Sequence, residues 1–239
     1  MRSRPKNLLD ENPEVLKQLA KYNPYIARVY DYPELLLPHP TAENFQELWD
    51  RKNKDNIGDA SPGKVHIEIG CGSNSYLIEW ALENPRDFFI GFELRYKRLV
   101  LAANKIQKQN IRNILLLRER GEFLDEYLTH KSIDCLHINF PDPWSKKAKR
   151  KHRILSTEFL TNIRPYFCSG GELRFKTDHL EYFKTVTGIL NQLEFYTIDQ
   201  HTEDLHQSAY DTENILTEFE MLFKSKGNPP IGYLRAKIL

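Results

Sequence analysis

The chain has 239 residues, 40% of them hydrophobic, 12% aromatic and 28% charged, which is ordinary globular composition and excludes a disordered chain. The length fits one α/β domain with an extension, or at most two small domains. With 34 Lys and Arg against 33 Asp and Glu, the net charge is +1, so the overall balance predicts neither a nucleic-acid nor a membrane partner.

Cysteine and histidine patterns predict neither disulfides nor a metal site. The three cysteines, Cys71, Cys135 and Cys168, include no C-x-x-C pair, and the eight histidines include no H-E-x-x-H motif. No apolar run approaches the roughly 18 residues that a membrane span needs, and the segment Met1–Lys6 lacks the apolar stretch of a signal peptide. We therefore expect a cytoplasmic protein, a monomer or a homodimer, that uses neither a metal nor a membrane.

Residues 1–63 form an N-terminal extension in our interpretation, and residues 64–239 form the main domain. Asn12 as a cap and a proline at the first turn predict a helix over Pro13–Lys21. A second short helix starts at Thr41, and its apolar spacing predicts that it packs on the main domain. We expect the extension to be partly helical and flexible at its start. The apolar residues of the second helix are Phe45, Leu48 and Trp49.

From Lys64 onward, strand-like and helix-like segments alternate. The expected strands are Val65–Ile69, Phe88–Phe92, Ile114–Leu117, Ile133–Ile138, Glu172–Lys176, Phe195–Ile198 and Tyr233–Ile238. The expected helices are Tyr76–Leu82, Lys97–Ile106, Phe123–Leu128, Ser156–Ile163, Leu180–Leu193 and Leu216–Lys224. This alternation predicts a Rossmann-like α/β fold, a doubly wound, mostly parallel seven-stranded sheet with helices on both faces. Such sheets bind ligands beyond the carboxyl ends of their strands.

The first strand leads into a glycine loop. Gly70 and Gly72 are expected where the backbone turns sharply and approaches a ligand. Glu68 would repel a bound phosphate, but it favours the sulfonium and ammonium groups of S-adenosylmethionine. Glu93, at the end of the second strand, can accept two hydrogen bonds from a ribose diol. Where a dinucleotide site would need a third glycine, the chain has Ser73, Asn74 and Ser75. The alternative is that Glu68 and Glu93 are surface acids that stand at strand ends by chance and bind no cofactor.

The fourth strand ends in the segment Asn139–Trp144, in which two prolines flank Asp142 and hold its carboxylate rigidly over the sheet edge. The basic run Ser145–Arg153 follows, with six positive charges within nine residues. Such a run can simply form a solvated surface, and Trp144 can simply pack in the protein interior. Beside a methyl-donor site, however, the run would bind phosphates while Trp144 stacks on a base, as in recognition of unpaired RNA.

Two further polar segments are expected at the same edge. One is Lys176–Asp178, after the fifth strand, and the other is Thr217–Glu220, near the start of a late helix. Thr217 and Glu220 share one helical face, where a capping box is the structural alternative. The functional interpretation is recognition of a base edge by the carboxylate and the hydroxyl.

Together these segments resemble the bacterial tRNA (guanine-N7-)-methyltransferase family, whose members are class I S-adenosylmethionine-dependent methyltransferases. The resemblance runs from about residue 64 to the end of the chain. It implies S-adenosylmethionine as methyl donor, no metal, and a guanosine in the tRNA variable loop, usually position 46, as the site of 7-methylguanosine formation. The segments that carry it are Glu68–Gly72, Phe140–Trp144 with the basic run, Phe175–Asp178 and Asn214–Glu220.

The resemblance also implies roles for single residues. Glu68, Glu93 and Asp142 match cofactor-side positions of the family, and Asp142 is also its proposed catalytic residue. The basic segment Arg2–Lys6 looks like the family's flexible basic N-terminus. The positions that match its tRNA side are Lys146, Asp178, Thr217, Glu218, Phe219 and Glu220.

Departures from the family pattern follow the first and third strands. Family members usually carry Asp or Asn after the third strand for the adenine, but Arg120 stands here, and Glu119 or Glu122 would have to substitute. Asn74 replaces a residue that is often small in the family and either tightens the glycine loop or caps the next helix.

Two other functions fit parts of the sequence. Asn139–Trp144 is close to the loops of amine methyltransferases, although an extra residue and the basic run count against that chemistry. An RNA-binding module with a vestigial cofactor site would explain Arg120. Binding of S-adenosylmethionine separates the second alternative from an enzyme.

Overall fold

The computed structural model describes residues 13–57, 63–224, 227 and 229–239. Two expectations, the capping role of Asn12 and the basic segment Arg2–Lys6, lie outside these residues. None of the described helices is long and apolar enough to span a membrane.

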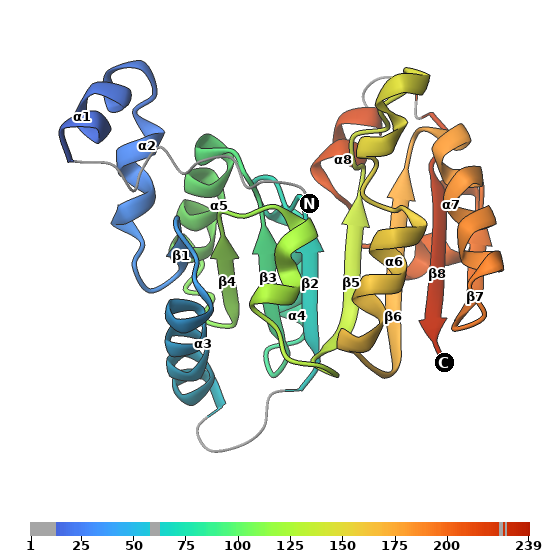
Figure 1. Cartoon of the computed structure of the whole chain (residues 1–239), viewed down its shortest axis with the longest axis horizontal. Helices are drawn as coiled ribbons and strands as arrows, with labels where there is room; N and C mark the ends of the chain where they lie inside the picture. Colours follow the sequence, from blue (N-terminus) through green and yellow to red (C-terminus); the bar gives the residue numbers. More distant parts are fainter. Residues whose placement is uncertain (1–12, 58–62, 225–226, 228) are drawn as a thin grey trace.

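An eight-stranded sheet forms the middle of the molecule, in the order β1-β4-β3-β2-β5-β6-β8-β7 (Figure 1). Its strands are β1 Leu36–Leu37, β2 Val65–Ile69, β3 Phe88–Phe92, β4 Ile114–Leu117, β5 Ile133–Asn139, β6 Phe167–Thr177, β7 Tyr196–Thr202 and β8 Gly232–Ile238. All neighbours pair in parallel except β8, which is antiparallel to β6 and β7. The predicted Rossmann-like fold is confirmed, with one correction: β1 adds an eighth strand by pairing with β4.

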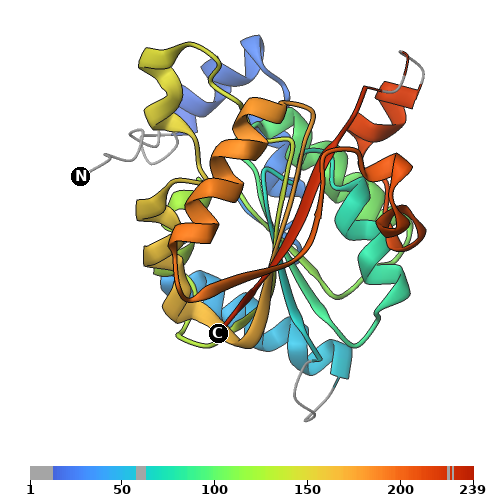
Figure 2. The same cartoon turned by 90° about the vertical axis from the view of Figure 1, so that its right-hand side faces the viewer.

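Helices cover both faces of this sheet (Figure 2). The α-helices are α1 Pro13–Tyr22, α2 Tyr25–Arg28, α3 Ala42–Ile57, α4 Ser75–Glu83, α5 Tyr96–Lys108, α6 Thr157–Ile163, α7 Leu180–Gln192 and α8 Glu218–Lys224. Helices α3, α6 and α7 pack on one face, and α4 and α5 pack on the other. The helix expected over Phe123–Leu128 is instead a short 3-10 segment, η2 Gly121–Glu126. Helix α8 starts two residues later than expected, because Thr217 is its cap.

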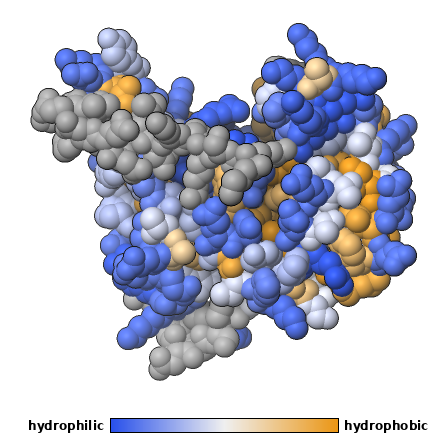
Figure 3. Space-filling model, viewed as in Figure 1, coloured by the Kyte–Doolittle hydropathy of each residue, from blue (hydrophilic) through white to orange (hydrophobic). Residues whose placement is uncertain are grey.

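The carboxyl ends of the parallel strands lie at the upper edge in Figure 1, and the molecular surface is hollowed at this edge (Figure 3). Consecutive strands and their crossover helices bring the loops that follow β2, β3, β4 and β5 to this one edge. The fold therefore positions the candidate residues beside each other.

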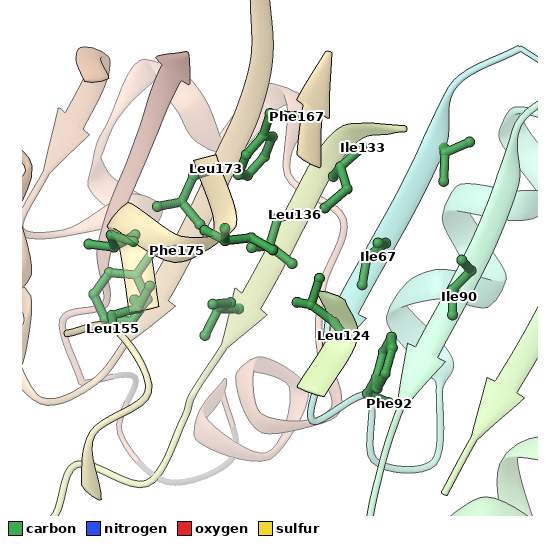
Figure 4. Close-up of a cluster of buried hydrophobic side chains, with 14 of the residues drawn as sticks. Ile67, Ile90, Phe92, Leu124, Ile133, Leu136, Leu155, Phe167, Leu173 and Phe175 are labelled. Atoms are coloured by element: carbon green, nitrogen blue, oxygen red, sulfur yellow. The ribbon is translucent and has the colours of Figure 1, made fainter. Parts of the chain in front are cut away.

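Two apolar cores sandwich the sheet. The larger includes Ile67, Phe92 and Leu136, which point from neighbouring strands to one face (Figure 4). Helix α3 contributes Phe45 and Leu48 to this core, so the predicted packing of that helix on the main domain is confirmed. The smaller core, on the other face, takes up Val29 and Leu36 from the N-terminal segment. The N-terminal segment thus shares both cores, and the domain boundary at residue 63 stays a prediction.

Candidate active site

A cavity of about 750 Å³ opens at the carboxyl edge of the sheet, where β2, β3, β4 and β5 end. Because β3 and β4 lie on one side of β2 and β5 lies on the other, this edge is the switch point where such sheets bind ligands. The predicted residues that line the cavity are Glu68, Gly70, Gly72, Glu93, Asp142, Thr217, Glu218 and Phe219. Those outside the lining are Lys146, Asp178 and Glu220.

The glycine loop after β2 has the backbone conformation that the sequence predicts. Gly70 and Gly72 have positive φ values of 78° and 58°, which favour glycine. Apart from the chain neighbours, none of the described residues would lie within 4 Å of a Cβ at either position, so the space before the loop is open to a ligand. The loop is fixed from behind, because the N–H groups of Gly70 and Cys71 donate to the Phe92 carbonyl at 2.8 and 3.0 Å.

Asn74 does not cap α4 with its side chain. It stands at the N-cap position in the left-handed region, with φ of 65°, and makes no side-chain cap hydrogen bond. Its side chain is fully buried, and neither its amide nitrogen nor its oxygen has a hydrogen-bond partner among the described residues. Its backbone N–H donates to the Cys71 carbonyl at 2.8 Å, and asparagine tolerates this left-handed conformation better than most residues. That Asn74 tightens the loop stays a prediction.

Glu68 is a buried carboxylate with an incomplete set of partners. Its side chain is 3% exposed, and Oε1 accepts a hydrogen bond from Asn139 Nδ2 at 2.8 Å. Its Oε2 has no hydrogen-bond partner among the described residues. Burial raises the pKa of Glu68 to about 7 despite the hydrogen bond from Asn139. An unpaired buried carboxylate oxygen in a cavity wall fits a cationic ligand.

Glu93 presents a carboxylate from the end of β3. Its Oε1 accepts hydrogen bonds from the N–H groups of Leu94 and Arg95 at 2.8 and 2.9 Å. These contacts fix the half-buried side chain in the cavity wall and leave Oε2 for a ligand such as a ribose diol.

After β4, the cavity wall contains Glu119, Arg120 and Glu122, the three charged residues near the expected adenine contact. Arg120 Nη2 donates to Glu122 Oε1 at 2.8 Å, so these two side chains pair with each other. Glu119 is buried and accepts hydrogen bonds from the Tyr127 hydroxyl and from the Arg120 N–H. Both acids are thus hydrogen-bonded within the protein. The presence of Arg120 does not by itself indicate that the cofactor site is vestigial.

Asp142 lies in a loop with strained backbone. Phe140 and Trp144 flank it and have positive φ values of 48° and 41°, which is uncommon for bulky residues and typical of functional sites. Asp142 is exposed, and its carboxylate makes no side-chain hydrogen bond with the described residues. The loop is tied down by Arg153, whose Nε donates to the Pro143 carbonyl at 2.7 Å.

The basic run divides into a buried and an exposed part. Arg153 is only 4% exposed and binds Glu181 at 2.7 Å, so it holds the Asp142 loop. The other cations of the run flank or belong to the exposed 3-10 segment η3 Lys147–His152. Trp144 is 38% exposed, and its ring lies 5.5 Å from the His152 ring, so plain core packing is not its role. Lys149 and His152 line the cavity.

The structure contains the capping box at the start of α8. Thr217 Oγ1 accepts from the Glu220 N–H at 3.1 Å, and the Thr217 N–H donates to Glu220 Oε2 at 2.8 Å. Glu220 is fully buried, and Lys176 Nζ lies 3.1 Å from its carboxylate. The interpretation of Glu220 as a base-edge acceptor is therefore corrected: its carboxylate is committed to the fold.

Three residues in the site were not singled out from the sequence. Asn139 holds Glu68, and Arg98 and Lys105 of α5 contact Glu218 at 3.1 and 2.7 Å. Asn139 lies within the strand-end segment Asn139–Trp144, so its position in the sequence is a usable signal. Arg98 and Lys105 stand 120 and 113 positions from Glu218, and no local pattern connects residues that far apart.

Among the described residues, one group carries metal-ligating side chains: His66, Cys135 and His137, whose candidate ligand atoms lie within 4.8 Å of one another. The two rings hydrogen-bond each other at 3.0 Å, and the second nitrogen of His137 pairs with the Tyr76 hydroxyl. The remaining nitrogen of His66, Nε2, has no hydrogen-bond partner among the described residues and lies 3.4 Å from Asp87 Oδ2. The expectation of no metal stays a prediction.

Comparison with known sequences gives consistent matches. A family profile described as "Putative methyltransferase" matches residues 62–231. A tRNA (guanine-N(7)-)-methyltransferase of Streptococcus uberis is 32% identical over 197 residues, 82% of this chain and 89% of that protein. A protein of Mycoplasma genitalium with the same name is 34% identical over 174 residues, 72% and 83% of the two chains.

A bifunctional glycosyltransferase/methyltransferase of Fusobacterium nucleatum is 38% identical over 218 residues. These cover 91% of this chain but 33% of that protein, so the chain spans about a third of its length.

Solved structures share the fold. The 16S rRNA methyltransferase KamB has a TM-score of 0.58 at 11% identity, over 80% of this chain and 93% of that one. A structure described as an antibiotic-related methyltransferase has a TM-score of 0.57 at 17% identity, over 84% and 95%. The architecture is therefore that of the Rossmann-like methyltransferases.

Proposed function

Because this chain belongs to the tRNA (guanine-N(7)-)-methyltransferase family, we propose that it transfers a methyl group from S-adenosylmethionine to N7 of a guanosine at position 46 in the tRNA variable loop. It is an S-adenosylmethionine-dependent methyltransferase. The observation that carries the proposal is one cavity that joins a buried, unpaired carboxylate oxygen of Glu68 to the exposed Asp142 and the aromatic ring of Trp144.

The residues around the glycine loop would hold the cofactor. S-adenosylmethionine supplies, when bound, an electrophilic methyl group on a positively charged sulfur. Glu68 favours a cation because its Oε2 is buried without a hydrogen-bond partner in the described part of the chain. Glu93 is oriented by two backbone N–H groups that both bind Oε1, and its other oxygen would accept from a ribose. Gly70 and Gly72 let the backbone approach the ligand, since no Cβ fills the space.

Asp142 is our candidate catalytic residue. Guanine N7 has a lone pair and no proton, so its attack needs alignment but no general base. Positive charge develops on the purine during the transfer, and a carboxylate beside the ring stabilises that charge more than the neutral ground state. The strained loop presents Asp142 to the cavity with no internal hydrogen-bond partner among the described residues, which leaves its charge available to the base.

The RNA side of the proposal uses the mouth of the cavity. Trp144 and Phe219 expose aromatic surface there, 38% and 47% of each residue, and unpaired bases stack on such rings. We propose that Thr217, Glu218 and Phe219 form the wall that receives the base. Lys146 and Asp178 are exposed outside the cavity lining, where only the larger RNA substrate would meet them.

The direct test is nucleoside mapping. The full chain is incubated with S-adenosylmethionine and an unmodified tRNA transcript, and the modified nucleoside is identified and located by mass spectrometry. We expect 7-methylguanosine in the variable loop, and slower methylation of a perfect RNA duplex, because the purine must leave the stack. Methylation of an exocyclic amine would favour amine methyltransferase chemistry. Absence of S-adenosylmethionine binding in equilibrium dialysis would favour an RNA-binding module.

A further inference from the structure

Glu218, the first residue of α8, is held by side chains of two other elements. Lys105 Nζ of α5 lies 2.7 Å from its Oε1, and Arg98 Nη1 lies 3.1 Å from its Oε2. Ser75 Oγ, at the start of α4, donates to Oε1 at 3.0 Å, and Ser73 Oγ of the glycine loop donates to the same atom. Lys105 also donates to both serine hydroxyls, at 2.8 and 3.2 Å. Lys105 therefore lies at the centre of this cluster.

The cluster holds the carboxylate in its charged form. Burial alone would raise the pKa of Glu218, but hydrogen bonds from Lys105, Ser73 and Ser75 lower it to about 2. Even so, the side chains of Lys105 and Glu218 are 38% and 34% exposed. An ion pair this exposed contributes little to the stability of the whole fold. Its effect should be local, on the position of α8.

Helix α8 depends on such contacts for its position. It has seven residues, which is too short to be stable in isolation. Glu218 fixes one side of its first turn to α5, and Glu220 fixes the other side to Lys176. Phe219 lies between these two anchors and faces the cavity.

Phe219 connects this turn to the Asp142 loop. Its ring stacks on Phe140, with centroids 5.5 Å apart and an angle of 28° between the planes. Phe140 has a positive φ of 48° and stands two residues before Asp142. A contact network therefore runs from Lys105 through Glu218 and Phe219 to the loop that carries the candidate catalytic carboxylate.

We propose that Lys105 is a positioning residue for the methyl transfer, which holds Glu218 so that Phe219 fixes the Asp142 loop in its reactive place. This inference rests on the proposed function. Lys105 itself does not line the cavity, so it acts through Glu218 and not by touching the substrate.

The test compares Lys105→Met with Lys105→Arg, and with Lys108→Met as a matched control. Lys108 is an exposed lysine in the last turn of the same helix, outside the cavity lining. We expect Lys105→Met to lower kcat by about tenfold, less than the roughly hundredfold that a full 1 Å misplacement can cost, with KM for tRNA within about twofold of wild type. Lys105→Arg keeps the cation and should restore most of kcat, and Lys108→Met should match wild type.

One further measurement separates positioning from general destabilisation. Amide hydrogen exchange, measured without tRNA, should show faster exchange over 218–224 in Lys105→Met and unchanged exchange in the β-strands. A wild-type kcat in Lys105→Met, or unchanged exchange over 218–224 in that variant, would overturn the inference.

The two proposals fail in different ways. If the wild-type chain forms no 7-methylguanosine in tRNA, the proposed function fails while the exchange measurement still reports the contact between Lys105 and α8. If wild type is active and Lys105→Met is equally active, the proposed function stands and the positioning role is wrong.

Discussion

Replacing Glu68 with glutamine tests the electrostatics of the cofactor end. The carboxylate is buried, and its pKa rises from the usual 4.5 to about 7. Between these two pH values the folded protein holds a proton that the unfolded chain has lost, so stability falls as the pH rises through this window. Each pKa unit corresponds to about 1.4 kcal/mol, so the wild type loses about 3 kcal/mol of unfolding free energy here. Glutamine has nearly the same shape and does not titrate.

Urea unfolding at pH 4.5 and pH 8 measures this difference. The stability of Glu68→Gln relative to wild type should increase by about 3 kcal/mol between the two conditions. Comparing variant with wild type cancels the titration of all other groups. The matched control is Glu79→Gln, an exposed carboxylate on α4, which should follow the wild type at both pH values.

Cofactor binding should show the opposite trend from stability. A cationic ligand needs Glu68 ionised, so S-adenosylmethionine affinity of the wild type should fall about tenfold for each pH unit below about 7. Glu68→Gln should bind more weakly at pH 7 and lose this dependence between pH 5 and pH 7. Isothermal titration calorimetry without tRNA measures both. If the variant keeps the wild-type pH profile, or binds equally tightly at pH 7, Glu68 does not meet the cation.

Three other substitutions test the substrate end and the fold. Asp142→Asn should lower kcat much more than tRNA affinity, because the lost interaction belongs to the transition state; unchanged turnover at saturating substrates would contradict that role. Neutralising Lys146, Lys147 and Lys149 together should weaken tRNA binding and flatten its salt dependence while S-adenosylmethionine affinity stays close to wild type; equal loss of both affinities would indicate misfolding. Glu220→Gln should cost about 3 kcal/mol of unfolding free energy, because it leaves a buried lysine without its counter-charge; a chemical denaturation curve like that of wild type would show that the pair is dispensable.

The hydrophobic periodicity of the sequence predicts the bounds of the central strands well but misses the edge strand β1. The bounds of β2, β3 and β4 agree with the sequence because these strands are short, buried on both faces and bounded by turn residues, and because β3 and β4 are apolar runs. Strand β1, over Leu36–Leu37, has two residues and thus no period to detect. Its pairing with β4 depends on tertiary contacts that no local pattern encodes.

The candidate site was predictable where chain order brings residues to one edge. The positions of Glu68, Glu93 and Asp142 follow from strands that end side by side. Contacts between a late helix and α5 were not predictable, because Lys105 and Glu218 are 113 positions apart and each alone resembles a solvated surface residue.

Two buried glutamates differ in how completely the fold satisfies their carboxylates. Glu220 faces a buried lysine, and its carboxylate also accepts the Thr217 N–H, so the fold itself satisfies its charge. Glu68 has one amide donor and an oxygen with no partner among the described residues. A buried charge without compensation is costly, and burial accordingly raises the pKa of Glu68 to about 7. We propose that a cationic ligand supplies the missing compensation at this cavity wall. The sequence alone presented both residues as acids at the sheet edge, and only the completeness of their partners distinguishes their roles.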